Sequence, residues 1–132
     1  MLFEQLLREI ALKFLIVDNS RAMRRIVSRT IRQAGYEDAT FLEAENGRDA
    51  MELAVSESPD FILSDWNMPE MTGIEFLNKL KADELKIPFG FVTSQSTPAM
   101  IAEATDGGAL FLLVKPFSAE DMNQVLSVVV PT

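Results

Sequence analysis

Five polar residues stand at the ends of short apolar runs, and their side chains are of types that can carry chemistry together. Oxygen ligands suit Mg²⁺, a hard ion that often binds one or two carboxylates together with phosphate oxygens. A carboxylate can also attack phosphorus and form an aspartyl phosphate, while an ammonium and a hydroxyl can neutralise or hydrogen-bond the transferred group. The five residues are Asp18, Asn19, Asp65, Thr93 and Lys115.

Most of these residues also have an ordinary structural explanation. Asp18 suits a helix-capping position, Asp65 suits the loop that precedes Pro69, and Lys115 suits a solvated surface position. Taken one at a time, each residue is better explained in this structural way. Their shared place at the ends of successive apolar runs nevertheless favours one common site.

Short apolar runs alternate with helical patterns five times along the chain, which predicts a repeated βα unit. The predicted strands are residues 14–17, 40–44, 61–64, 89–93 and 110–114. The predicted helices are residues 21–34, 47–56, 74–81 and 97–105, with a last helix capped by Ser118. Nearly continuous apolar runs are typical of strands buried on both faces. We therefore expect an α/β fold with a doubly wound five-stranded parallel sheet, which binds its ligands at the carboxyl ends of the strands.

The composition excludes several kinds of site and partner. The chain has 132 residues, the size of one domain, and its formal net charge of −8 disfavours nucleic acid as a partner. Without cysteine or histidine it can form no disulfide, thiolate or imidazole metal site, Ser-His-Asp triad or phosphohistidine. No apolar run reaches the roughly 18–20 residues that span a membrane, and no signal peptide is recognisable. We therefore expect a cytoplasmic protein with no membrane partner.

Four segments resemble the receiver domain of two-component response regulators, and most closely the CheY-like receivers. They are FLIVDNSRAMRRIV, DFILSDWNMPEMTG, FVTS and LLVKPF, and the resemblance covers about residues 13–130. It implies the (βα)5 flavodoxin-like receiver fold, with Asp65 as the phosphoacceptor and with Thr93 and Lys115 contacting the phosphoryl group. It also implies a cis peptide bond between Lys115 and Pro116, which places Lys115 over the site.

The resemblance further implies Mg²⁺ as the cofactor, held by residues at the strand ends. Asp18 and Asp65 would supply carboxylates, and the backbone carbonyl of Asn67 would supply a neutral oxygen. Most receivers have a second acid directly after the first, but this chain has Asn19, whose amide oxygen is a ligand without charge. The missing charge should weaken Mg²⁺ binding and lessen the repulsion around a phosphorylated Asp65.

A second departure from the family concerns signalling. CheY-like receivers carry a Tyr or Phe on the fifth strand that rotates when the hydroxyl of the fourth strand moves. Leu112 occupies that position here, and the adjacent Phe111 is expected to point to the other face of the strand. The usual aromatic readout therefore lacks its residue.

The main hypothesis is a single-domain response regulator that a histidine kinase phosphorylates on Asp65 with Mg²⁺. It would then bind a downstream protein such as a motor or an effector, as in chemotaxis, and would have no enzymatic activity beyond self-phosphotransfer and autodephosphorylation. The alternative is a pseudo-receiver that serves as a constitutive interaction module, with Asn19 and Leu112 as signs of decay. A small phosphohydrolase is a third hypothesis, but Asn67 stands where such an enzyme needs its second acid.

Two further features lie outside these motifs. We divide the chain into an N-terminal helical extension, residues 1–12, and a receiver domain, residues 13–132. Residues 2–10 place an apolar stripe on one side of a helix, formed by Leu2, Phe3, Leu6, Leu7 and Ile10. This stripe either packs on its own domain or forms a two-fold homodimer contact, and we predict the dimer because the receiver's own helices already cover the sheet.

Five arginines on the first predicted helix form either a solvated face or a docking surface for an acidic partner such as a histidine-kinase module: Arg21, Arg24, Arg25, Arg29 and Arg32.

Overall fold

Five parallel strands form one sheet in the computed structural model of this chain, which describes residues 11–129. Their order across the sheet is β2-β1-β3-β4-β5. The strands are β1 Lys13–Val17, β2 Thr40–Ala44, β3 Phe61–Ser64, β4 Phe89–Thr93 and β5 Phe111–Val114. This order is the doubly wound, flavodoxin-like arrangement, so the predicted fold class is confirmed.

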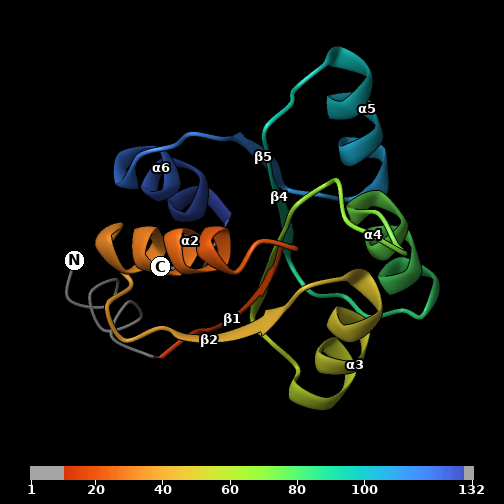
Figure 1. Cartoon of the computed structure of the whole chain (residues 1–132), viewed down its shortest axis with the longest axis horizontal. Helices are drawn as coiled ribbons and strands as arrows, with labels where there is room; N and C mark the ends of the chain where they lie inside the picture. Colours follow the sequence, from red (N-terminus) through yellow and green to blue (C-terminus); the bar gives the residue numbers. More distant parts are fainter. Residues whose placement is uncertain (1–10, 130–132) are drawn as a thin grey trace.

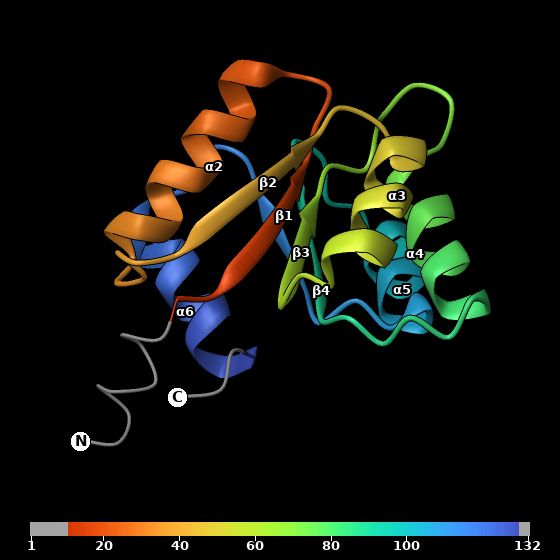
Figure 2. The ribbon, with the colours of Figure 1, turned by 90° about the horizontal axis from the view of Figure 1, so that it is seen from below.

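Helices cover both faces of the sheet (Figure 1). They are α2 Arg21–Gln33, α3 Gly47–Glu57, α4 Gly73–Ala82, α5 Pro98–Gly107 and α6 Ala119–Val129. Figure 2 shows α2 and α6 on one side of the strands and α3, α4 and α5 on the other. The bounds of β2, β3 and β4 match the predicted ones, and those of the other elements differ by at most two residues at either end, which is the ordinary uncertainty of helix and strand ends.

The core lies in two layers, one on each side of the sheet. Alternate residues of β1 face opposite layers: Phe14 and Ile16 pack towards α2 and α6, whereas Leu15 and Val17 pack towards the other three helices. The central strands β1, β3 and β4 are buried almost throughout, as their continuous apolar sequence predicts. The edge strands β2 and β5 are partly exposed because each has a neighbour on one side only.

Each of these helices begins at a side chain that accepts a hydrogen bond from a backbone N–H three residues later. The capping residues are Ser20, Asn46, Thr72, Thr97 and Ser118. Gly108 ends α5 in the left-handed conformation, with φ of 96°, which glycine adopts without strain. These local signals fix where each helix starts in the chain that follows the preceding strand.

The carboxyl ends of β1 and β3 meet where the strand order reverses. The chain leaves β1 towards β2 on one side and later returns to place β3 on the other side of β1. In open parallel sheets this reversal leaves a crevice in which ligands bind. Asp18 and Asp65 directly follow these two strands and therefore lie at that crevice.

The predicted N-terminal helix and homodimer contact of residues 2–10 lie outside the described residues and stay predictions. Leu12 already belongs to the packed domain, because its carbonyl accepts a 2.8 Å hydrogen bond from the N–H of Thr40 and its side chain packs beside α2 and α6. Within residues 11–129, no helix has the length and hydropathy to cross a membrane.

Gly73, the first residue of α4, lets the chain after β3 fold back against the site. Its N–H donates a 2.8 Å hydrogen bond to the carbonyl of Trp66. A Cβ atom at this position would overlap the backbone carbonyl of Asp65 and would lie 2.8 Å from the ring of Phe91. Neither neighbour is a flexible side-chain end, so only glycine fits here.

We predict that Gly73→Ala lowers the free energy of unfolding by about 1–3 kcal/mol, although helix propensity alone would favour alanine by about 1 kcal/mol. Urea unfolding measures the change. Gly107→Ala is the matched control, since its only close contact would be with the movable end of the Leu77 side chain, at 2.9 Å, and its other neighbours lie at ordinary contact distances. A Gly73→Ala protein as stable as Gly107→Ala would contradict the prediction.

Candidate functional site

Lys115 joins two carboxylates at the carboxyl edge of the sheet. Its Nζ atom lies 3.0 Å from Oδ2 of Asp18 and 3.5 Å from Oδ2 of Asp65. The three residues follow β1, β3 and β5, so three strands that are distant in sequence contribute to one charged cluster. Each side chain is mostly buried, with 7% of Asp18 and 15% of both Asp65 and Lys115 exposed. The structure thus brings together three of the residues that the sequence singled out.

Asp18 is held from several directions. Its N–H donates to the carbonyl of Ala44 at 3.1 Å, and its Oδ1 accepts the N–H of Ser20 at 2.8 Å. Its own carbonyl accepts a 2.7 Å hydrogen bond from Nη1 of Arg24. Ser20, not Asp18, caps α2, which leaves the second carboxylate oxygen of Asp18 for Lys115. The residue therefore shapes the loop and faces the cluster as well.

Asp65 is positioned by the backbone around it. Its N–H donates to the carbonyl of Val17 at 2.8 Å, and its Oδ1 accepts the N–H of Trp66 at 2.7 Å. Burial raises the pKa of the Asp65 carboxyl above its ordinary value. The Lys115 ammonium and the Trp66 N–H oppose this rise in pKa, whereas the neighbouring Asp18 carboxylate adds to it. The contacts with Lys115 and Trp66 therefore do not fully offset the effect of burial and of Asp18 on the pKa of Asp65.

Thr93 and two amide residues complete the edge. Thr93 is fully buried at the end of β4, where its carbonyl accepts the N–H of Lys115 at 2.8 Å and its Oγ1 accepts the N–H of Gln95 at 3.4 Å. Asn19 and Asn67 are exposed on the loops that follow β1 and β3. The peptide bond that follows Lys115 is cis, as the resemblance implied.

The donor atoms at this edge fit Mg²⁺ better than a softer metal. The carboxylates of Asp18 and Asp65 converge on a single ammonium, so they lie close enough to share a cation. Among residues 11–129 there is no group of three His, Cys, Asp or Glu side chains that could hold a metal ion. Any metal here would therefore bind through two carboxylates, neutral oxygens and water, which is typical of magnesium sites.

The comparisons with known proteins point to one family. Residues 14–127 match the family described as the response regulator receiver domain. This chain belongs to that family. Chemotaxis protein CheY1 of Helicobacter pylori strain J99 is 38% identical over 124 residues, which cover 92% of this chain and 98% of that protein. Chemotaxis protein CheY of Pseudomonas aeruginosa is 39% identical over 115 residues, which cover 86% of this chain and 91% of that protein.

Solved structures agree with this assignment. The structure of the chemotaxis protein CheY4 of Vibrio cholerae superposes with a TM-score of 0.80 at 35% sequence identity, covering 91% of this chain and 99% of that one. The chain is therefore a CheY-like receiver domain of two-component signalling. The predicted (βα)5 receiver fold is confirmed by the same comparison.

Leu112 occupies the position at which the resemblance implies an aromatic switch residue. Leu112 packs in the layer of α3, α4 and α5 and pairs with Phe91 of the neighbouring strand. Phe111 lies in the opposite layer, where its ring stacks on Phe61 with centroids 5.8 Å apart and covers Gly90. The expectation that Phe111 faces away from Leu112 is thus confirmed.

Sequence reasoning missed the part that Arg24 plays in this receiver. It was grouped with four other arginines as a solvated or docking face, but only 13% of its side chain is exposed. Its guanidinium bridges the carbonyl of Asp18, at 2.7 Å, and Oε1 of Glu43 on β2, at 2.8 Å. The available signal was positional: Arg24 lies one turn into α2, and Glu43 lies on the strand beside β1. For Arg24 the expectation of a solvated or docking side chain is wrong, because it supports the loop.

The raised pKa of Asp65 predicts a pH dependence of stability. In the folded receiver the pKa of Asp65 lies above its ordinary value of 3.8, so the folded protein keeps the Asp65 proton to a higher pH than the unfolded chain does. As the pH rises from below 3.8 through the folded-state pKa, the wild type should therefore lose free energy of unfolding relative to Asp65→Asn. Urea unfolding of both proteins over a pH series, with EDTA present, measures the difference. A difference that does not change with pH would show that this carboxyl has an ordinary pKa.

Proposed function

We propose that Asp65 of this receiver accepts a phosphoryl group from a phosphohistidine of a histidine kinase. The supporting observation is the cluster in which Lys115 contacts the carboxylates of Asp18 and Asp65 at the carboxyl edge of the sheet. Membership of the receiver family supports the same assignment. The function of the protein is then to carry a signal in the phosphorylation state of one side chain.

In this proposal an oxygen of Asp65 forms a bond to phosphorus as the bond from phosphorus to the imidazole nitrogen of the kinase breaks. The leaving nitrogen takes up a proton, and Asp65 becomes an acyl phosphate. Its Oδ2 is already beside Lys115, while its Oδ1 is held by the N–H of Trp66. The Lys115 ammonium offsets charge on the phosphoryl oxygens, and the Thr93 hydroxyl can donate a hydrogen bond to one of them.

The residues that would hold Mg²⁺ are Asp18 and Asp65 through carboxylates, Asn19 through its amide oxygen and Asn67 through its backbone carbonyl. When bound, the ion supplies positive charge to the phosphoryl oxygens during transfer. Arg24 keeps the carbonyl of Asp18 in place and thereby orients this loop. Because Asn19 is neutral, the site offers one charge fewer than a pocket with two adjacent acids.

The output of this receiver is proposed to be a phosphorylation-dependent contact with a downstream protein, such as a motor or an effector in chemotaxis. The relatives from Helicobacter and Pseudomonas are both named chemotaxis proteins, which favours this setting. With Leu112 in place of an aromatic residue, the signal would have to travel by movement of β5 and its neighbours rather than by rotation of a ring.

The pseudo-receiver remains the alternative against which the proposal is tested. Asn19 and Leu112 are the departures from the family that favour a pseudo-receiver. Asp65, Thr93 and Lys115 are nevertheless all present, and Asp65 and Lys115 are joined in one charged cluster. A constitutive interaction module would have no need of a buried lysine between two carboxylates. We therefore favour the phosphoacceptor.

We predict that a small phosphodonor with Mg²⁺ adds one phosphoryl group to the wild type and none to Asp65→Asn. Intact mass spectrometry measures the addition. Asp83→Asn is the matched control, because Asp83 is an exposed aspartate at the end of α4, and this variant should be labelled like the wild type. Undiminished labelling of Asp65→Asn, or no labelling of the wild type, would sink the phosphoacceptor assignment.

We also predict that Asn19→Asp tightens Mg²⁺ binding by about 1–3 kcal/mol, because it restores a full charge to a divalent-ion site. Fluorescence of Trp66 can follow the titration, since this buried ring directly follows Asp65 and lies 4.7 Å from the Phe91 ring between centroids. Phosphorylation by the small donor should accelerate in parallel. Equal Mg²⁺ affinities for the two proteins would show that residue 19 does not contribute its charge to the metal.

A further inference from the structure

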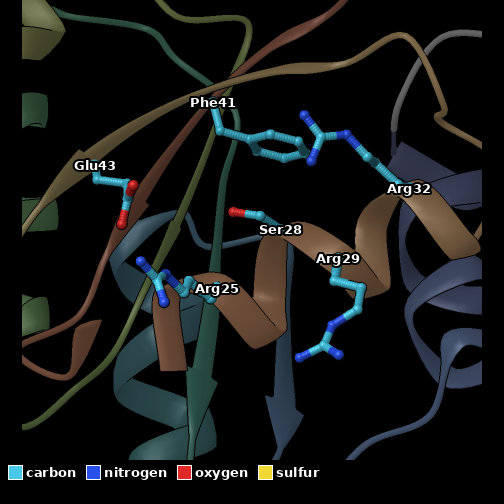
Figure 3. A pocket seen from close by; sticks show the side chains of 6 residues that line it. All are labelled: Arg25, Ser28, Arg29, Arg32, Phe41 and Glu43. Carbon is cyan, nitrogen blue, oxygen red and sulfur yellow. The ribbon is translucent and has the colours of Figure 1, made fainter. Parts of the chain in front are cut away.

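A basic groove lies between α2 and the edge strand β2 (Figure 3). Its volume is about 300 Å³, and it is lined by Arg25, Ser28, Arg29, Arg32, Phe41 and Glu43. None of these residues belongs to the cluster around Lys115. The proposed phosphoacceptor chemistry therefore leaves the groove without a role.

The arginines of the groove are aligned along one side of α2. Arg25, Arg29 and Arg32 are spaced by four and three residues, so they project from successive turns on one side of α2. Within residues 11–129, Arg25 and Arg29 have no ion pair with an acidic side chain, in contrast to Arg24, which is paired with Glu43. In a chain of net charge −8, this local concentration of positive charge is a preferred position for an anion.

Arg32 is oriented by a cation–π contact with the Phe41 ring. Its guanidinium carbon lies 4.7 Å from the centre of the Phe41 ring, and Phe41 in turn stacks on Phe14 with centroids 5.8 Å apart. Figure 3 shows the Arg32 guanidinium beside this ring, with Ser28 on the facing turn of the helix. A guanidinium that is already oriented loses less entropy when it binds, and its planar fork matches two oxygens of a phosphate.

The groove offers hydrogen-bond acceptors as well as the arginine donors. Glu43 uses Oε1 for Arg24, at 2.8 Å, and still presents a carboxylate to the groove. Ser28 donates its hydroxyl proton to the carbonyl of Arg24 at 2.9 Å, so its oxygen faces the groove as an acceptor. A complementary ligand has a phosphoryl group for the arginines and hydroxyl or amino donors for Ser28 and Glu43. Inorganic phosphate has hydroxyl groups only on the phosphorus atom itself, so it offers no donor separate from the group that the arginines would bind.

The dimensions and the charge of the chain favour a small molecule over a polymer. A volume of about 300 Å³ is at the lower end of the range for small-molecule sites. A nucleic acid or a long acidic segment would extend beyond the groove onto a surface whose net charge repels it. We propose that this groove binds a small phosphorylated ligand carrying hydroxyl or amino donors, of the mononucleotide or sugar-phosphate class.

Titration of the ¹⁵N-labelled chain in EDTA tests this proposal by NMR, with AMP, glucose 6-phosphate and inorganic phosphate as separate probes. EDTA removes divalent ions, so binding at Asp65 does not contribute. We expect at least one organic phosphate to shift the signals of α2 and β2 and to bind at least about tenfold more tightly than inorganic phosphate. Preference for AMP indicates a nucleotide, and preference for glucose 6-phosphate indicates a sugar phosphate. Equal binding of all three probes, or no binding, would overturn the proposal.

Variants locate the site. Arg25→Gln combined with Arg29→Gln should weaken binding of the preferred probe at least about tenfold, whereas Arg21→Gln, an exposed arginine of the same helix outside the groove, should have little effect. Glu43→Gln should reduce the preference for the organic probe over inorganic phosphate. Equal effects of the Arg21 and the Arg25/Arg29 substitutions would mean that the helix attracts anions only through its general charge. Displacement of the probe by an acidic peptide that binds more tightly would assign the groove to a protein partner instead.

Discussion

The ammonium group of Lys115 is the contact on which the arrangement of the site depends. It lies between two carboxylates that would otherwise repel each other at a mostly buried edge, 3.0 Å from Asp18 and 3.5 Å from Asp65. Burial of such a pair without a cation would be costly, because a low-dielectric environment strengthens the repulsion of like charges. The cation reaches both acids only because β1 and β3 are adjacent and β5 ends at the same edge of a parallel sheet. The strand order, the helix caps and the close turn at Gly73 together hold these strand ends side by side.

The same electrostatic balance gives meaning to the asparagine beside Asp18. With Asn19 neutral, one lysine faces two acids, and the cluster of these three side chains has a net charge of −1 when both acids are ionised. A second acid at position 19 would double that charge, which would favour a divalent cation and disfavour an added phosphoryl group. This receiver therefore has a cluster that is nearly balanced without any bound ion. The phosphoryl transfer that we propose would then depend more on Lys115 and on the held position of Asp65 than on a strong acidic field.

Much of this architecture could be predicted from local signals in the sequence. Apolar runs predicted the strands, capping residues such as Ser20 and Thr97 predicted the helix starts, and the polar residues at strand ends predicted which groups would meet. What the sequence did not disclose depends on contacts between distant segments. Arg24 could not be told apart from its neighbouring arginines, because its partner Glu43 lies on another strand and the pairing depends on the strand register. The groove beside it was not foreseen, since its lining comes from both α2 and β2.

The guanidinium of Arg24 also contacts both the charged cluster's loop and the lining of the basic groove. It contacts the carbonyl of Asp18 in the loop of the charged cluster and the carboxylate of Glu43 in the lining of the basic groove. A shared group of this kind couples two equilibria, because a change in how Glu43 is engaged alters the free energy of holding Asp18, and the reverse holds equally. Thermodynamic reciprocity then requires that an occupant of the groove and a modification of the strand ends either favour or oppose each other to the same degree. If the groove binds the proposed ligand and Asp65 is phosphorylated, this one side chain would let the concentration of a small anion change how strongly the receiver responds to phosphorylation.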